Sequence, residues 1–329
     1  MIISQTPLRI SFLGGGTDFE DYYKKNEGFV VSTAIDKYIF VILNERFDDY
    51  IVLNYSDKER VTSVEDIRHE LVREALIKTG IKKSIEVTMI ADIPSEGSGL
   101  GSSSCLTVGL LNAMYMYQGI QVTAEKLAQE ACEIEINSCR KPIGKQDQYI
   151  AAYGGLCGIK FLKNNNVDVE KIILSDNQRR ILGSNLLMFF TGITRKSSDI
   201  LLEQKSKIKN IQKELDSIKK LAFDAKKSLY ENKFHNLGNY LNKNWGYKKK
   251  FASNITNPQL DEMYKKSVNA GAKGGKILGA GGGGFLLLYC EREKQNKLRK
   301  ALSQYREMPF LLEKDGSKII FNYRRYSWK

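Results

Sequence analysis

The sequence predicts an α+β protein with two lobes. Strand-like and helix-like segments intermix along the chain without the steady βα rhythm of a Rossmann sheet or a barrel. The 329 residues are enough for two domains of ordinary size. A polar stretch at 163–171, KNNNVDVEK, is typical of a connection between lobes. We therefore expect one lobe over residues 1–170 and a second over residues 171–329.

Hydrophobic periodicity places the elements of each lobe. Strand-like runs in the first lobe are Ile2–Phe12, Phe29–Leu43, Tyr50–Tyr55, Ile85–Ile93 and Gly154–Leu162. Helical patterns there are Val64–Thr79, Ser102–Tyr117 and Ala124–Ser138. Strand-like runs in the second lobe are Asn185–Thr191, Lys276–Leu278, Phe285–Cys290 and Lys318–Tyr323. Its helical patterns are a long lysine-rich helix after Lys205, then Phe234–Phe251, Pro258–Ala270 and Arg292–Tyr305.

Composition excludes several classes of protein. No segment approaches the run of about 18 apolar residues that a membrane span needs, so no membrane partner is expected. The start, MIISQTPLRISF, lacks the features of a signal peptide, which predicts a cytoplasmic protein. The five cysteines are odd in number and form no CxxC pair, and the chain has only two histidines. We expect reduced, mostly buried thiols and neither a zinc site nor a disulfide framework.

The net charge of +13 is concentrated in one region. Residues 205–250 contain 13 lysines and four acidic residues, an excess of nine positive charges. Apolar residues recur every three or four positions there, at Ile208, Ile211, Leu215, Ile218, Leu221, Ala225 and Leu229. The lysines are therefore expected on the solvated face of a helix. Nucleic-acid binding is the alternative, but the region has no arginine and few aromatic residues, so no nucleic-acid partner is expected.

The stretch PSEGSGLGSSS, residues 94–104, joins a strand-like run directly to a helical pattern. The first turn of a helix has unpaired N–H groups and the positive end of the helix dipole, and glycines allow close approach of an anion. A flexible linker is the alternative, but no extra spacer separates the strand from the helix. We expect a phosphate loop that binds ATP through Pro94, Gly97, Ser98, Gly99, Leu100, Gly101, Ser102, Ser103 and Ser104.

The second glycine run, GAGGGG at residues 279–284, has the spacing of a dinucleotide-binding fingerprint. The apolar run FLLLYC follows it, however, and this predicts a strand where the fingerprint requires a helix. We expect instead a tight glycine hairpin whose backbone approaches a ligand or the other lobe. A purely structural turn is the alternative.

Two further segments combine charged residues with glycine. PLRISFLGGGTDFEDY carries Arg9 inside a strand and Asp18 after a glycine turn. KPIGKQDQYIAAYGG carries Asp147, with Lys145 two residues before it. A carboxylate near a cation is the usual arrangement of a base in phosphoryl transfer, whereas a helix cap is the structural alternative for Asp147. Glu135 on the preceding helix offers a hard oxygen ligand for Mg²⁺.

Together these segments resemble the GHMP kinases, the superfamily of galactokinase, homoserine kinase and mevalonate kinase. PLRISFLGGGTD is similar to the N-terminal substrate motif, PSEGSGLGSSS to the central PxxxGLGSSA loop, and KILGAGGGGF to the C-terminal glycine motif. The three motifs span nearly the whole chain in the family's order. The resemblance implies a first lobe like ribosomal protein S5 domain 2, a ferredoxin-like second lobe, and ATP and Mg²⁺ as cofactors.

The resemblance also implies roles for single residues. Asp147 matches the catalytic aspartate, and Arg9 matches the arginine that sits beside it in sugar kinases. Ser103 and Glu135 match the Mg²⁺-binding residues, and Asp18 matches the acid that holds sugar hydroxyls. Ser104 departs from the usual alanine without affecting the loop. The implied substrate contacts are Gly14, Gly15, Gly16, Thr17, Asp18, Lys145, Arg195, Lys196, Gly281, Gly282 and Gly283.

Within the family, the GGGTD form with KQDQY and TGITRKSSDIL is most similar to the D-glycero-D-manno-heptose 7-phosphate kinases. Galactokinases carry a bulkier Glu-His pair at Gly15-Gly16, and its loss opens the pocket to an anionic substituent. The expected partner is a phosphorylated sugar, gripped at its distal phosphate by Lys145, Arg195 and Lys196, although each could be a solvated surface cation. Fucose, a uronic acid or galactose is the alternative acceptor, and a homodimer is left open.

Overall fold

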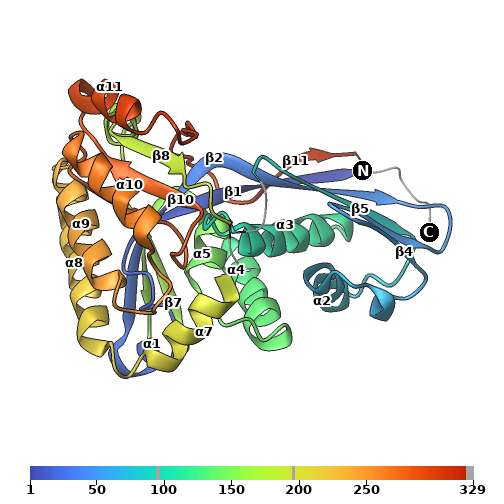
Figure 1. Ribbon diagram of the computed structural model, residues 1–329. Coiled ribbons are helices and arrows are strands. Elements are labelled where there is room, and N and C mark those ends of the chain that lie inside the picture. The colour runs from blue at the N-terminus through green and yellow to red at the C-terminus, as the bar shows by residue number, and fades with distance from the viewer. Residues whose placement is uncertain (94–96, 195–196, 324–329) are drawn as a thin grey trace.

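The computed structural model describes residues 1–93, 97–194 and 197–323, which form two sheets with their covering helices (Figure 1). In the described residues the larger sheet runs β11-β1-β2-β5-β3-β4, and β6 and β7 attach to it through β2. The strands are β1 (Ile2–Leu13), β2 (Gly28–Glu45), β3 (Ile51–Asn54), β4 (Lys58–Val61), β5 (Ile85–Ala91), β6 (Leu156–Phe161), β7 (Val167–Lys171) and β11 (Lys318–Asn322).

The long strand β2 organises the larger sheet. It pairs with β1 along most of its length, with β5 through Ile39–Glu45, and with β6 through Gly28–Thr33. Residues 28–35 are buried without alternation, whereas buried and part-exposed residues alternate over 39–43. The first stretch is therefore covered on both faces and the second on one.

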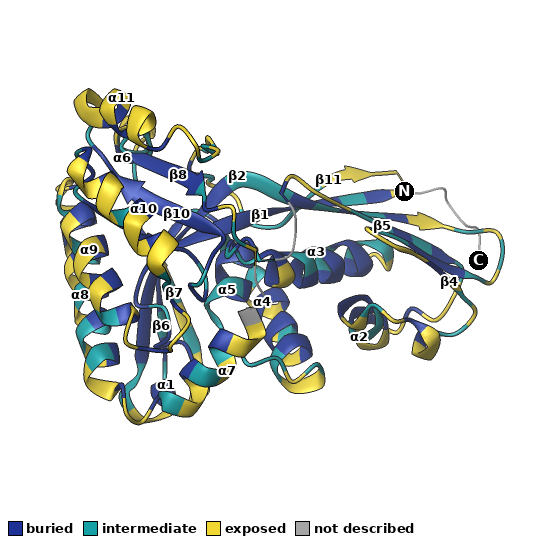
Figure 2. Cartoon of the chain, viewed as in Figure 1, coloured by how far each residue is buried: buried dark blue, intermediate teal, exposed yellow. Residues whose placement is uncertain are grey.

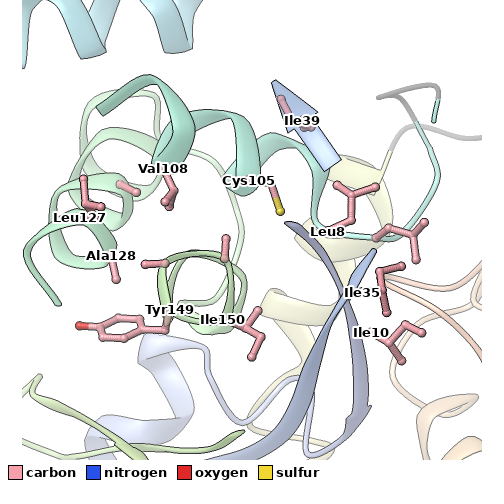
Figure 3. Close-up of a cluster of buried hydrophobic side chains, with 14 of the residues drawn as sticks. Leu8, Ile10, Ile35, Ile39, Cys105, Val108, Leu127, Ala128, Tyr149 and Ile150 are labelled. Atoms are coloured by element: carbon pink, nitrogen blue, oxygen red, sulfur yellow. The ribbon is translucent and has the colours of Figure 1, made fainter. Parts of the chain in front are cut away.

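Helices of the first lobe cover one face of this sheet. The glycine-flanked helix α3 (Ser102–Tyr117) packs against β1 and β2, and eleven of its sixteen residues are buried (Figure 2). Figure 3 shows the core that forms there, with labelled side chains Leu8, Ile10, Ile35, Ile39, Cys105, Val108, Leu127, Ala128, Tyr149 and Ile150. The neighbouring elements are α1 (Glu20–Asn26), η1 (Val64–Asp66), α2 (Glu70–Thr79), α4 (Ala124–Cys132), the π-helical η2 (Glu133–Ser138) and α5 (Gln146–Tyr153).

The second lobe contains a smaller antiparallel sheet in the order β8-β10-β9, from β8 (Leu186–Phe190), β9 (Gly274–Ile277) and β10 (Phe285–Tyr289). The 306–308 segment joins its β8 edge through the backbone bonds Phe190 N–H to Arg306 O and Met308 N–H to Met188 O. This βαββαβ succession is that of a ferredoxin-like unit, as expected. Its helices are α6 (Asp176–Ser184), α7 (Ser197–Lys207), α8 (Gln212–Tyr230), α9 (Asn236–Lys248), α10 (Pro258–Asn269) and α11 (Arg292–Ala301).

The chain returns to the first sheet at its end, where β11 pairs with the outer edge of β1. Residues 318–322 thus belong with the first lobe by strand pairing, although the sequence places them with the second. The polar stretch at 163–171 also contains β7, which pairs with β6, so the expected boundary after residue 170 falls inside a strand.

The long helix expected after Lys205 is divided into α7 and α8, whereas α9 lies within the helical pattern expected at Phe234–Phe251. Helix α7 ends at Lys207, and α8 ends before Asn232, whose positive φ of 57° is incompatible with a continuing helix. The predicted apolar face is nevertheless buried, at Ile208, Ile211, Leu215, Ile218, Ala225 and Leu229. Several lysines form ion pairs, among them Lys226 with Glu170 and Lys250 with Glu214.

Two expectations from composition can be compared with the structure. Four of the five cysteines are buried and none is in a disulfide; Cys139 is partly exposed. Among the described residues, no helix is both long and apolar enough to cross a membrane.

Candidate active site

Both lobes line one cavity. The first lobe contributes residues of β1, of the glycine turn that follows it and of the start of α5; the second contributes residues of α7, α9, β9 and the second glycine run. The lining residues are Arg9, Ser11, Gly15, Gly16, Asp18, Phe19, Ile143, Gly144, Gln146, Asp147, Leu201, Gln204, Lys248, Lys276, Gly279 and Ala280. Residues far apart in the sequence therefore meet at one site between the sheets.

Arg9 and Asp147 form a two-point ion pair in this cavity. Arg9 Nε donates to Asp147 Oδ1 at 2.7 Å, and Nη2 donates to Oδ2 at 2.7 Å. Burial disfavours the arginine charge, but the Asp147 carboxylate outweighs it, so the pKa of Arg9 is raised. The Asp147 side chain is 22% exposed against 5% for Arg9, so the carboxylate is open to a ligand while the guanidinium is enclosed. The two hydrogen bonds from Arg9 hold the Asp147 carboxylate in a fixed orientation.

The expected phosphate loop lies directly against this pair. Arg9 Nη1 donates to the Gly99 carbonyl at 2.7 Å, and a Cβ on Gly101 would lie 3.3 Å from Asp147 Oδ2. Gly97, Gly99 and Gly101 have φ values of 71°, 75° and 79°, a left-handed conformation that glycine adopts readily. Helix α3 starts at Ser102, so its free N–H groups lie at the loop, as an anion site requires.

The serines of the loop differ in their surroundings. The hydroxyls of Ser98 and Ser102 lie 3.2 Å apart, and both residues are buried, as are Leu100 and Ser104. Ser103 is exposed at the helix start, where its hydroxyl hydrogen-bonds Glu135. Pro94, also expected to bind ATP, lies outside the described residues.

Glu135 is fully buried in η2 beside Ser103. Its second oxygen accepts from the Gln148 amide at 2.6 Å, and the Lys141 ammonium donates to Ser103 Oγ at 3.2 Å. Burial raises the pKa of the Glu135 carboxyl, against the opposing effect of these hydrogen bonds. The described residues contain no cluster of three or more acidic, histidine or cysteine ligands. A single carboxylate with one hydroxyl is the donor set of an Mg²⁺ site in which phosphate oxygens and water complete the coordination.

Asp18 is held by backbone N–H groups. It is 2% exposed and accepts from Gly16 N at 2.8 Å and from Gln146 N at 3.3 Å. Burial raises the pKa of Asp18, although these N–H groups oppose the effect, and the nearby Asp147 charge adds to it. A carboxyl group fixed in this way can bind the hydroxyls of a ligand in the cavity.

The three glycines of the turn before Asp18 differ in the space that surrounds them. A Cβ on Gly14 would lie 2.1 Å from the Phe29 carbonyl oxygen, so only glycine fits there. The buried Thr17 hydroxyl donates to the Gly14 carbonyl at 2.8 Å and holds the turn together. Gly15 and Gly16 both line the cavity. A Cβ on Gly15 would meet side-chain atoms only at 3.4 Å or more, whereas one on Gly16, whose φ is 105°, would lie 2.7 Å from Gln204 Nε2.

Of the three cations expected at a distal phosphate, Lys145 lies among the described residues. Lys145 donates to Asn165 Oδ1 at 2.6 Å, lies over the Tyr23 ring, and is not among the residues that line the cavity. Burial lowers the pKa of Lys145. Arg195 and Lys196 lie outside the described residues.

The second glycine run packs against the phosphate loop, and its expected approach to the other lobe is confirmed. A Cβ on Gly279 would lie 2.6 Å from Gly99 Cα, and one on Gly284 would lie 2.5 Å from the Ser98 carbonyl oxygen. Gly279 and Ala280 line the cavity. Gly281, Gly282 and Gly283, which were predicted to contact substrate, are not among the lining residues. Gly281 and Gly282 approach Ile255, and Gly283 approaches Ile193.

Sequence reasoning missed several lining residues, chiefly Ser11, Gln204, Lys248 and Lys276. Lys248 belongs to a run of three lysines, and nothing in the sequence separates it from its exposed neighbours. Lys276 had a usable signal, since it is a charged residue within the apolar strand before the glycine run. Buried charges are rare in strands and often mark functional sites.

Known proteins are similar to this chain along nearly its whole length. Residues 66–155 match the model of the GHMP kinases N terminal domain, and residues 225–307 match that of the GHMP kinases C terminal. A relative from Campylobacter jejuni, named D-glycero-alpha-D-manno-heptose 7-phosphate kinase, is 32% identical over 334 residues, covering 96% of this chain and 98% of the relative.

Solved structures show the same fold. The crystal structure of a D-glycero-D-manno-heptose 1-phosphate kinase from Bacteriodes thetaiotaomicron has a TM-score of 0.82 and 25% identity, covering 99% of this chain and all of that one. The Methanococcus jannaschii mevalonate kinase, at 22% identity over 94% of this chain and 98% of that one, has a TM-score of 0.73 and shares the fold. The chain therefore belongs to the GHMP kinases, a family of ATP-dependent kinases, and is a phosphotransferase with an alcohol group as acceptor.

Proposed function

We propose that this protein is an ATP- and Mg²⁺-dependent sugar 1-kinase that phosphorylates the anomeric hydroxyl of D-glycero-D-manno-heptose 7-phosphate. The product would be the 1,7-bisphosphate, a precursor of nucleotide-activated heptose for a surface polysaccharide. The observation that carries the proposal is the Arg9–Asp147 pair, which lies in one cavity with Asp18 and directly against the glycine loop.

Support for the substrate comes from the pocket and from the relatives. Gly15 adds no side chain to the cavity wall, which suits an acceptor larger than a hexose. The relative that is 32% identical is named a heptose 7-phosphate kinase, and the structure at 25% identity is named a heptose 1-phosphate kinase. Both names contain the heptose and differ in the phosphate, so the position of that phosphate is what an experiment must decide.

Each residue has a defined part in the transfer. Asp147 accepts the proton of the anomeric hydroxyl as the sugar oxygen bonds to the γ-phosphorus of ATP and the bond from that phosphorus to the departing ADP breaks. Arg9 holds the Asp147 carboxylate in place. Asp18 binds sugar hydroxyls and orients the ring. The N–H groups of the glycine loop and of the first turn of α3 stabilise phosphate oxygens. Catalysis then depends mainly on positioning and on charge stabilisation.

Ser103 and Glu135 are the residues that would hold Mg²⁺. They offer two hard oxygen donors at the start of α3, next to the loop assigned to the ATP phosphates. When bound, the ion would offset the negative charge of those phosphates. The buried Gln148 amide fixes the orientation of the Glu135 carboxylate.

A panel of sugars and sugar phosphates, assayed by ADP release, tests the proposal. We expect the highest kcat/KM with D-glycero-D-manno-heptose 7-phosphate, and product analysis by ³¹P NMR should place the new phosphate at the anomeric carbon. The panel includes fucose, glucuronic acid and galactose, which are the acceptors of the alternative sugar 1-kinases. Turnover of one of these, with none of the heptose 7-phosphate, would overturn the substrate assignment.

A further inference from the structure

A buried lysine reaches from the second lobe to the first. Lys276 on β9 is 2% exposed, and its ammonium donates to the carbonyl oxygens of Ser11, at 2.9 Å, and Phe12, at 3.2 Å. Both carbonyls belong to β1, close to Arg9 along the strand. An ammonium has three N–H donors, so one is left for a partner in the cavity that Lys276 lines.

No carboxylate neutralises Lys276 by direct contact, because among the described residues it forms no ion pair. Three charged groups act on Lys276 from a distance. The cations Lys248 and Arg9 lower its pKa, and the Asp18 carboxylate raises it. Burial, reinforced by the two cations, holds the pKa of Lys276 well below its ordinary value. A buried ammonium in this situation is stabilised when an anion is placed beside it.

A second lysine of the same lobe lies at the same cavity. Lys248, the last residue of α9, is 6% exposed, and its ammonium donates to the Gly279 carbonyl. Gly279 is the residue that packs against Gly99 of the phosphate loop. Lys248 therefore lies where the acceptor cavity meets the phosphate loop.

The buried hydroxyl of Ser11, in the cavity wall, lacks a hydrogen-bond partner among the described residues. Ser11 lines the cavity and is 4% exposed. Buried hydroxyls are normally paired, so an unpaired one in a cavity wall points to a ligand atom that completes it. Ser11 lies at the same place as Lys276, because its own carbonyl accepts the lysine bond.

We infer that Lys276, Lys248 and Ser11 form a binding site for phosphoryl oxygens inside the acceptor cavity. The inference rests on the proposed function, in which the acceptor carries one phosphate and receives another. The oxygens belong either to the phosphate already on the acceptor or to the group in transfer. In both cases the second lobe contributes positive charge to a reaction whose carboxylate lies in the first.

Lysine-to-methionine variants test the site, because methionine keeps much of the side-chain length and removes the charge. Lys276→Met and Lys248→Met are assayed with heptose 7-phosphate and with the same heptose lacking its phosphate. The control is Lys273→Met, which removes a lysine of the same segment whose ammonium pairs with Glu291 and does not line the cavity. Thermal unfolding establishes that each variant is folded.

Two results support the inference and identify the phosphate. A rise of about tenfold or more in KM for heptose 7-phosphate, with no change for the unphosphorylated heptose, assigns the site to the acceptor's phosphate. A fall of about tenfold or more in kcat with both acceptors assigns it to the group in transfer. Lys273→Met should match the wild type in both assays.

The inference is overturned if the folded Lys276→Met and Lys248→Met variants keep both kcat and KM within about twofold of the control. If Lys276→Met does not fold, because the Ser11 and Phe12 carbonyls lose their donor, Lys248→Met decides alone by the same criteria. Failure of the proposed function is a separate result. If the wild type does not use heptose 7-phosphate, the variants are assayed with the sugar that the panel identifies. A fall of about tenfold or more in kcat then supports the inference, and a kcat within about twofold of the control overturns it.

Discussion

The carboxylates of the candidate site are held in two different ways. Asp147 is partly exposed and makes two hydrogen bonds to the Arg9 guanidinium. Asp18 and Glu135 are enclosed, contact no cation directly among the described residues, and have pKa values raised by burial. The difference matches the roles proposed above, which are proton transfer for Asp147 and ligand binding for Asp18 and Glu135. Four predictions test that separation of roles, in order of decreasing effect.

Asp147→Asn should have the largest effect. The amide keeps the shape of the side chain but cannot accept the proton of the attacking hydroxyl, so kcat should fall by about 10²–10⁴-fold. ATP affinity, measured by calorimetry, should stay nearly constant, because the phosphate loop is unchanged. Asp261→Asn, an exposed position in the first turn of α10, is the control and should retain full activity. A kcat of Asp147→Asn equal to that of the wild type would remove this residue from the mechanism.

Arg9→Lys should have the next largest effect. Lysine keeps the charge but loses the two-point contact with Asp147 and the bond to Gly99, so the carboxylate is misoriented. We expect kcat to fall by about a hundredfold. Arg46→Lys makes the same change in another two-point pair, with Asp48, which lies outside the cavity, and should leave kcat unaltered. Equal effects of the two substitutions would show that Arg9 does not act through its geometry.

Asp18→Asn should alter binding more than turnover. Its amide oxygen can still accept from Gly16, but the charge that binds sugar hydroxyls is lost. Steady-state kinetics should show KM for the acceptor rising by about tenfold while KM for ATP stays constant. The opposite pattern, a raised KM for ATP alone, would contradict the assignment of Asp18 to the acceptor.

Glu135→Gln should stabilise the protein slightly and weaken its use of Mg²⁺. Burial raises the pKa of Glu135 in the folded state above its pKa in the unfolded state. As the pH rises from the unfolded-state pKa through the folded-state pKa, the unfolded chain loses this proton more readily, so the wild type loses stability. The variant lacks that loss of stability. Gln148 Oε1, which has no hydrogen-bond partner among the residues that the structure describes, can accept from the new amide. Tm should rise by a few degrees, about 2–4 °C, at pH 7.5, and the gain should shrink toward pH 4.5.

The same variant should need about tenfold more Mg²⁺ for half-maximal activity, since an amide is a weaker ligand than a carboxylate. Titration of Mg²⁺ at saturating ATP measures this. A Tm below that of the wild type at pH 7.5 would mean that favourable contacts outweigh the cost of burying the Glu135 carboxylate. An unchanged Mg²⁺ requirement would mean that Glu135 is not an Mg²⁺ ligand.

Local sequence patterns predicted many elements closely. Helix α3 spans Ser102–Tyr117, as its apolar periodicity predicts, and β1 spans Ile2–Leu13. Turn and helix signals also located the glycine loop before α3, because strand end, glycines and helix start are consecutive in the chain. The cavity brings Arg9, Asp18 and Asp147 together, which the family resemblance implied and which no local pattern contains.

Other features depend on contacts between distant segments. The polar residues 163–171 read as a linker, but pairing with β6 makes part of them a strand. The short helix α1 gave no clear periodic signal, and the break between α7 and α8 lies within the long helix expected after Lys205. In each case tertiary packing outweighed local preference.

The sequence by itself determined most of the strands and helices, the glycine loop and the residue types that phosphoryl transfer needs, because each is a property of neighbouring residues. Only the tertiary structure decided that β11 pairs with β1, that Gly279 packs on Gly99, and that Lys276 reaches the carbonyls of Ser11 and Phe12. These contacts join residues that are between 180 and about 320 positions apart, as the residue numbers show. Periodicity is a property of a short window, so it does not specify which distant windows meet.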